Sequence, residues 1–258
     1  MSRIKEAFAQ AKAENRAVFA GYLTASYPNE EEFIGHALNL LEHADLFEIG
    51  IPYSDPLGDG PTVQQSGEQV LKQGMSTAKV FEFIKELRAK TSKPIVVMTY
   101  YNPIYCYAGG EEGFLKALKE SGADGAILPD LPPDEADTLL PIARQLDLDT
   151  IFLIAPTSTE ERLKIVAEAS RGFIYAVSVT GVTGARQSLP AEVADLVNKA
   201  KAVSDLPIVV GFGISNSQTA RPITKVADGI AVGSALIRSV AENNLAAVAA
   251  DIAGACQR

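Results

Sequence analysis

The sequence contains no tryptophan and only two histidines and two cysteines among its 258 residues. His36 and His43 fall on one predicted helix and are not grouped with other metal-ligating side chains. Cys106 and Cys256 have neither the spacing of a zinc motif nor that of a disulfide framework, and they are typical of intracellular thiols. The sequence therefore predicts neither a metal centre nor a disulfide.

Long apolar runs and basic clusters are also missing. No apolar run reaches the roughly 18 residues that a membrane span needs. The net charge of −9, without a cluster of lysine and arginine, argues against a nucleic-acid groove. Residues 1–8 are typical of an amphipathic helix and lack the apolar core of a signal peptide. We expect a soluble, cytoplasmic protein with a single domain that spans residues 1–258.

Apolar runs rich in β-forming residues alternate with segments of helical pattern along the whole chain. Most of these runs are continuously apolar, as expected for parallel strands covered on both faces. The expected strands are 18–23, 46–51, 94–100, 125–129, 150–155, 173–179, 207–212 and 229–233.

Eight strands that each precede a helix favour a TIM (β/α)8 barrel with an extra N-terminal helix. Expected helices include one over residues 134–146, one capped by Ser215, and a C-terminal one broken near residues 243–244. An open doubly wound sheet is the alternative, but no G-x-G-x-x-G turn or P-loop follows any strand. In a barrel, the active site lies at the carboxyl ends of the strands.

Two acids mark the second expected strand and the loop after it. Glu48 interrupts an apolar strand, and a buried acid is unfavourable unless it is paired or used. Asp59 lies in a loop made stiff by proline and glycine. Each acid alone could be a hydrogen-bonded structural group; together they indicate a site.

No lysine lies at the carboxyl end of an expected strand. The nearest, Lys93, precedes its strand and so faces the opposite rim. A Schiff-base aldolase needs such a lysine, and a metal-dependent aldolase needs a ligand cluster. If carbon–carbon chemistry occurs here, the substrate must supply its own electron sink.

Glycine-rich turns follow the last two expected strands, at residues 209–215 and 232–235. Glycines let backbone N–H groups approach an anion, and a helix N-terminus adds its positive dipole end. This is the usual phosphate position in barrels, although tight turns alone would also explain the glycines. The polar, small-residue segment 178–186 has the composition of a mobile lid or of a passive surface loop.

The stretch 48–61, which reads EIGIPYSDPLGDGP, closely resembles a signature of the α subunit of tryptophan synthase. Residues 180–184, 211–214 and 233–234 resemble the lid loop and the phosphate site of that family. The last two motifs also occur in other phosphate-binding barrels. The resemblance extends over essentially the whole chain.

The resemblance implies a lyase that cleaves indole-3-glycerol phosphate to indole and glyceraldehyde 3-phosphate, with the indole ring as electron sink. Glu48 is then the general acid–base, and Asp59 accepts a hydrogen bond from the indole N–H. The family comparison also assigns a substrate-binding set and a phosphate-binding set. The first set is Tyr100, Tyr175, Thr183 and Phe212; the second is Gly184, Gly213, Gly233 and Ser234.

The same resemblance implies an α2β2 complex in which pyridoxal phosphate belongs to the β subunit and this chain holds no cofactor. Asp55 and the segments 102–107 and 129–133 would lie on the rim that faces this partner. Two alternatives remain open: another phosphosugar barrel enzyme, such as an isomerase or the synthase that makes the indole substrate, and a catalytically weak regulatory subunit.

Overall fold

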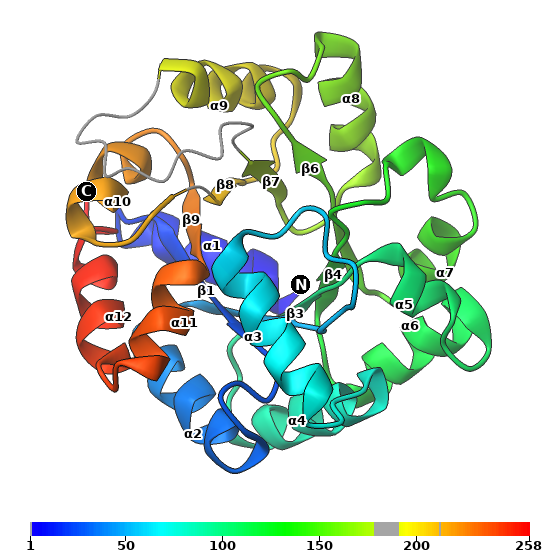
Figure 1. Cartoon of the computed structure of the whole chain (residues 1–258). Helices are drawn as coiled ribbons and strands as arrows, with labels where there is room; N and C mark the ends of the chain where they lie inside the picture. Colours follow the sequence, from blue (N-terminus) through cyan, green and yellow to red (C-terminus); the bar gives the residue numbers. More distant parts are fainter. Residues whose placement is uncertain (1, 178–190, 212) are drawn as a thin grey trace.

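A parallel β-sheet curls round the centre of the molecule, with helices surrounding it (Figure 1). The computed structural model describes residues 2–177, 191–211 and 213–258. The strands in these residues are β1 (Val18–Thr24), β2 (Leu46–Gly50), β3 (Ile95–Met98), β4 (Gly125–Ile127), β5 (Asp149–Ile151), β6 (Leu153–Ile154), β7 (Ile174–Val177), β8 (Ile208–Gly211) and β9 (Gly229–Val232).

The sheet closes into a barrel. Strand β1 pairs in parallel with both β2 and β9, and β5 and β6 pair with β4 and β7 respectively. Only Phe152 separates β5 from β6, and its carbonyl accepts a hydrogen bond from the Tyr175 N–H at 3.1 Å. The two segments are therefore halves of the single strand predicted over residues 150–155. The predicted TIM barrel is confirmed, with a one-residue irregularity in its fifth strand.

Helices follow the strands along the chain and cover the outside of the sheet (Figure 1). None of the helices described is long and apolar enough to cross a membrane. The helices are α1 (Arg3–Ala13), α2 (Glu30–Leu41), α3 (Pro61–Lys72), α4 (Thr77–Lys90), α5 (Tyr101–Tyr105), α6 (Gly110–Ser121), the 3-10 helix η1 (Pro133–Glu135), α7 (Leu139–Gln145), α8 (Glu160–Ala169), α9 (Ala191–Val203), α10 (Ser217–Thr224), α11 (Ser234–Ala241) and α12 (Leu245–Gly254).

Two of the helix predictions differ from the structure. The helix expected over residues 134–146 is divided into η1 and α7. Because α7 begins at Leu139, Pro141 lies in its first turn, where no intrahelical N–H bond is lost. Helix α10 is capped by Asn216 rather than Ser215, because the Asn216 side chain accepts the Thr219 N–H at 3.0 Å. The predicted C-terminal break is confirmed, between α11 and α12.

Helix α3 was not anticipated, because the proline- and glycine-rich stretch before it reads as loop. Gly60 is its N-cap and Pro61 its first residue, a position where the fixed φ of proline suits a helix and its missing N–H costs nothing. Helix α3 begins directly after the loop that carries Asp59. The sequence thus places a rigid element beside a predicted site residue.

The N-terminal helix closes the amino-terminal end of the barrel. Ile4, Phe8 and Ala11 form one buried face of α1, and they join the cluster of side chains that fills the barrel interior. The ring of Phe8 lies 5.8 Å from that of Phe173, which immediately precedes β7. Because these apolar groups are almost fully buried, α1 forms the floor of the barrel.

Asp124 links three parts of the amino-terminal rim. Its two carboxylate oxygens accept hydrogen bonds from Arg3 and Arg88, each at 2.8 Å. One of them also accepts the backbone N–H of Ile95 at 2.8 Å, at the start of β3. The carboxylate is buried, whereas the Arg3 side chain is partly exposed.

We predict that Asp124→Ala lowers the free energy of unfolding by about 3 kcal/mol, because it leaves the Arg88 guanidinium and the Ile95 N–H without their buried partner. Urea denaturation of the isolated chain measures this change. Lys72→Ala, in the exposed Glu68–Lys72 pair on α3, is the matched control and should change stability little. Equal effects from both substitutions would contradict the prediction.

Candidate functional site

Glu48 lies on β2 and faces the interior of the barrel. It is in register with Tyr22 on β1 and Val96 on β3. It lies two residues after Leu46 and so on the same face of the strand, and the Leu46 side chain belongs to the interior cluster. Only 1% of Glu48 is exposed. The strand therefore carries an acid above the apolar filling of the barrel, toward its carboxyl-terminal mouth.

The Glu48 carboxyl group has an unsatisfied oxygen. Oε1 is buried and has no hydrogen-bond partner among the residues that the structure describes. Burial raises the pKa of Glu48 to about 8. The carboxyl is therefore mostly protonated at neutral pH and can donate its proton to a group placed in the mouth.

Asp59 is held at the mouth by its own loop. Its N–H donates to the Pro56 carbonyl at 3.1 Å, and the Gln64 side-chain amide donates to the Asp59 carbonyl at 2.9 Å. Burial raises the pKa of Asp59 to about 6, and a hydrogen bond from Tyr100 opposes this rise. At neutral pH Asp59 is mostly ionised. The two acids thus differ in charge because their surroundings differ.

Tyr100 connects the Asp59 loop to the next strand along the sheet. Its hydroxyl oxygen accepts the Gly58 N–H at 2.9 Å, and burial followed by the charge of Asp59 raises the pKa of Tyr100. The ring lies 5.4 Å from that of Tyr53, which belongs to the same loop as Asp59. Tyr100, predicted as a substrate-binding residue, therefore lies beside Asp59.

Two tyrosines project into the mouth across glycines. A Cβ atom at Gly50 would lie 2.0 Å from the Tyr22 hydroxyl oxygen, and one at Gly211 would lie 2.2 Å from that of Tyr175. Both glycines therefore leave space that a phenol fills. Burial is the main cause that raises the pKa of Tyr175, followed by the charge of Glu48. The predicted residue Tyr175 is thus a neighbour of Glu48.

Sequence reasoning missed Tyr22. The signal was its position in the first strand, two residues before the end of β1 and in register with Glu48. The charges of Asp59 and Glu48 contribute, after burial, to raising its pKa. Tyr22 therefore lies close to both acids, and it has the same kind of buried phenol as Tyr175.

Three of the predicted phosphate-binding residues follow β8 and β9. Gly213 has φ +52°, and a Cβ atom there would meet open space. Gly233 is the N-cap of α11 and Ser234 its first residue, and no side chain caps this helix end. Backbone N–H groups at such a helix end suit an anion. Thr183, Gly184 and Phe212, with the predicted lid 178–186, lie outside the described residues.

No group of three or more histidine, cysteine, aspartate or glutamate side chains that could hold a metal occurs among the described residues. His36 lies on α2 beside Glu32, and Cys106 is exposed at the end of α5.

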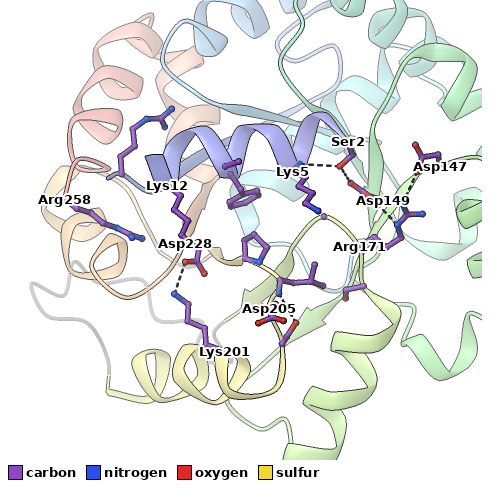
Figure 2. Close-up of a pocket in the computed structure, with 18 residues that line it drawn as sticks. Ser2, Lys5, Lys12, Asp147, Asp149, Arg171, Lys201, Asp205, Asp228 and Arg258 are labelled. Carbon is purple, nitrogen blue, oxygen red and sulfur yellow. Dashed lines mark hydrogen bonds and ion pairs between the residues drawn. The ribbon is translucent and has the colours of Figure 1, made fainter. Parts of the chain in front are cut away.

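A groove of about 1060 Å³ lies at the opposite end of the barrel, between α1 and the segments that precede β5, β7 and β8 (Figure 2). Some of its charged side chains bind one another: Lys201 pairs with Asp228 at 2.9 Å, and Arg171 with Asp147 at 3.0 Å. It lies at the amino ends of the strands and contains neither Glu48 nor Asp59. The candidate active site is therefore the mouth, not this groove.

The chain is similar to known proteins over its whole length. A family model described as tryptophan synthase alpha chain matches residues 8–256. The tryptophan synthase alpha chain of Deinococcus radiodurans is 50% identical over 260 residues, which span 100% of this chain and 96% of that protein. The corresponding protein of Opitutus terrae is 40% identical over 268 residues, with 100% of both chains covered.

Solved structures give the same result. The structure of tryptophan synthase from Mycobacterium tuberculosis in space group F222 has a chain with TM-score 0.94 and 40% identity, covering 100% of this chain and 99% of that one. Tryptophan synthase subunit alpha from Legionella pneumophila has TM-score 0.91 and 31% identity, covering 99% and 98%. The chain therefore belongs to the tryptophan synthase alpha chain family, whose role is in tryptophan biosynthesis.

Proposed function

We propose that this chain cleaves indole-3-glycerol phosphate to indole and glyceraldehyde 3-phosphate, as a carbon–carbon lyase that uses neither a metal nor a Schiff-base lysine. The observation that carries the proposal is the pair of acids at the barrel mouth. Glu48 is buried, and its Oε1 has no hydrogen-bond partner among the described residues. Its pKa of about 8 leaves it mostly protonated at neutral pH, whereas the pKa of Asp59 is about 6. A division of charge between two acids suits acid–base catalysis.

In the proposed mechanism, Glu48 donates its proton to the ring carbon that bears the glycerol chain. The positive charge that then develops on the indole nitrogen is stabilised by the ionised Asp59, which accepts a hydrogen bond from the indole N–H. Glu48 next removes the proton of the hydroxyl on the adjacent chain carbon. The carbon–carbon bond breaks, its electron pair returns to the ring, and that carbon becomes the aldehyde.

The remaining predicted residues bind the substrate in this scheme. Tyr100 and Tyr175 lie beside Asp59 and Glu48 respectively, which supports roles next to the indole and the glycerol chain. Gly213, Gly233 and Ser234 offer backbone N–H groups to the phosphate. From the sequence alone, we also propose that Thr183 and Phe212 bind the substrate and that Gly184 binds its phosphate.

We further propose that the chain works in the cytoplasm with a tryptophan synthase β subunit in an α2β2 complex, and that pyridoxal phosphate belongs to that partner. Two large apolar side chains at the mouth support a docking face. Leu57 is 95% exposed in the Asp59 loop, and Tyr105 is 66% exposed on α5, which follows the neighbouring strand. Exposed apolar groups beside one rim are typical of a protein-binding surface.

The alternative functions make different demands on the same rim. A phosphosugar isomerase, or the synthase that makes the indole substrate, would not explain two acids on β2 and its loop with pKa values set apart. A regulatory subunit would alter the turnover of a β subunit while releasing negligible indole itself. An indole-release assay on the isolated chain, with and without a β subunit, separates these functions.

We predict that Glu48→Gln and Asp59→Asn each lower the rate of indole formation by about 10²- to 10⁴-fold, because each removes a proton-transfer or charge-stabilising group. Affinity for inorganic phosphate, measured by calorimetry, should stay within about twofold of the wild-type value, since neither acid touches the glycine turns. Near-normal turnover in either variant would refute the assigned roles.

We predict a bell-shaped dependence of kcat/KM on pH. The rate should rise through pH about 6, as Asp59 ionises, and fall through pH about 8, as Glu48 loses the proton that it must donate. Indole release measured from pH 5 to pH 9.5 in buffers of constant ionic strength tests this expectation. A rate that stays level through pH 8 would show that protonated Glu48 is not required.

We predict that Tyr105→Asp weakens binding to a β subunit at least tenfold, because it places a charge in an apolar contact. Indole release by the isolated chain should not change, since Tyr105 points to solvent. Ile165→Asp is the matched control: Ile165 is an exposed apolar residue on α8, 37% accessible, and its substitution should leave β-subunit affinity unaltered. Titration calorimetry gives both affinities, and equal losses would count against the docking face.

A further inference from the structure

Three buried hydroxyl groups form a chain beside the two acids. The Tyr22 hydroxyl lies 3.4 Å from the Thr24 hydroxyl on the same strand, and the Thr24 hydroxyl lies 2.6 Å from that of Ser66 on α3. Ser66 in turn donates to the Val63 carbonyl at 2.8 Å. Thr24 and Ser66 are each 1% exposed, and Tyr22 is 7% exposed. Water is therefore largely excluded from the chain.

The Tyr22 oxygen keeps a free lone pair whichever way the hydrogen atoms along this chain point. A hydroxyl group has one hydrogen and two lone pairs. When Ser66 donates to the Val63 carbonyl, Thr24 donates to Ser66 and Tyr22 donates to Thr24, so both lone pairs of the Tyr22 oxygen are free. When Ser66 instead donates to Thr24 and Thr24 to Tyr22, one lone pair of the Tyr22 oxygen is free, as is its hydrogen.

The ring of Tyr22 lies between the two halves of the proposed site. Its hydroxyl end is opposite Gly50, two residues after Glu48, and its Cδ1 atom is 3.3 Å from where a Cβ atom of Gly233 would lie. Gly233 begins the helix end assigned to phosphate. Tyr22 therefore spans the stretch that the glycerol chain of the substrate must occupy, between the reacting carbon and the phosphate.

The free lone pair of Tyr22 can accept a hydrogen bond from a ligand hydroxyl that enters the mouth. Among the described residues no other side chain hydrogen-bonds to the Tyr22 hydroxyl. The proposed substrate carries two hydroxyls, of which Glu48 deprotonates the one on the reacting carbon. The second hydroxyl lies nearer the phosphate and keeps its hydrogen throughout the reaction.

On the basis of the proposed function, we propose that Tyr22 is a specificity-determining residue whose hydroxyl oxygen accepts a hydrogen bond from this second hydroxyl. The contact with Thr24 holds the Tyr22 hydroxyl in place beside the mouth. Because Ser66 and Val63 lie in the first turns of α3, the same bonds fix that helix, and the Asp59 loop before it, relative to Glu48.

Tyr22→Phe removes only the hydroxyl and tests the proposal. Indole release is measured with indole-3-glycerol phosphate, and calorimetry gives the Kd for indole-3-propanol phosphate, which lacks both hydroxyls. We expect kcat/KM to fall about three- to tenfold, as for one lost hydrogen bond, whereas Kd for the analogue stays within twofold. Tyr107→Phe is the control: its ring packs on Phe81 and Phe114, and neither quantity should change.

Thr24→Val provides a second variant should Tyr22→Phe not fold. It removes the contact that holds the Tyr22 hydroxyl in place, and kcat/KM should again fall while binding of the analogue persists. Equal loss with substrate and analogue, or no loss with either, would overturn the proposal. If the wild-type chain releases no indole, the proposed function fails first; an active wild type with an unaltered Tyr22→Phe variant refutes the Tyr22 assignment alone.

Discussion

The parallel pairing of β1 with β9 is the constraint on which the rest of the structure depends. Without it, β1 and β9 would be opposite edges of an open sheet. Glu48 on β2 and Asp59 in the loop after it would then be far from the glycine turns that follow β8 and β9. With it, the order β2-β1-β9-β8 places Glu48 two strands from Gly233 and three from Gly213. Closure thus assembles one site from the second strand and the two final strands.

Within that site, burial shifts the pKa values of the two acids more than any charged partner does. Neither Glu48 nor Asp59 has a cationic partner among the causes that shift its pKa; burial dominates for both. Glu48 is enclosed by strands on both sides, whereas Asp59 stands on a loop and gains a hydrogen bond from Tyr100. The difference in enclosure separates their protonation at neutral pH, and the buried phenols of Tyr22 and Tyr175 lie close to both acids.

The sequence was sufficient for the architecture and for singling out the two acids as candidates, because these signals are local. Continuous apolar runs predict buried parallel strands, and Glu48 is conspicuous within such a run. The irregularity at Phe152 has no local signal, and the register of Tyr22 with Glu48 cannot be read from the neighbours of either residue. The hydroxyl chain joins Thr24 to Ser66, 42 positions apart, and only the folded chain brings these groups together. Helix α3 was missed because Pro61 suits both a loop and a first helical turn.

The floor formed by α1 determines the route by which products leave. Ile4, Phe8 and Ala11 fill the amino-terminal end of the barrel together with Phe173, so the barrel axis offers no passage through the molecule. In the proposed reaction, indole formed beside Glu48 would leave past the carboxyl ends of the strands. Any protein that sits over Leu57 and Tyr105 would stand at that exit and receive the product before it reached bulk water.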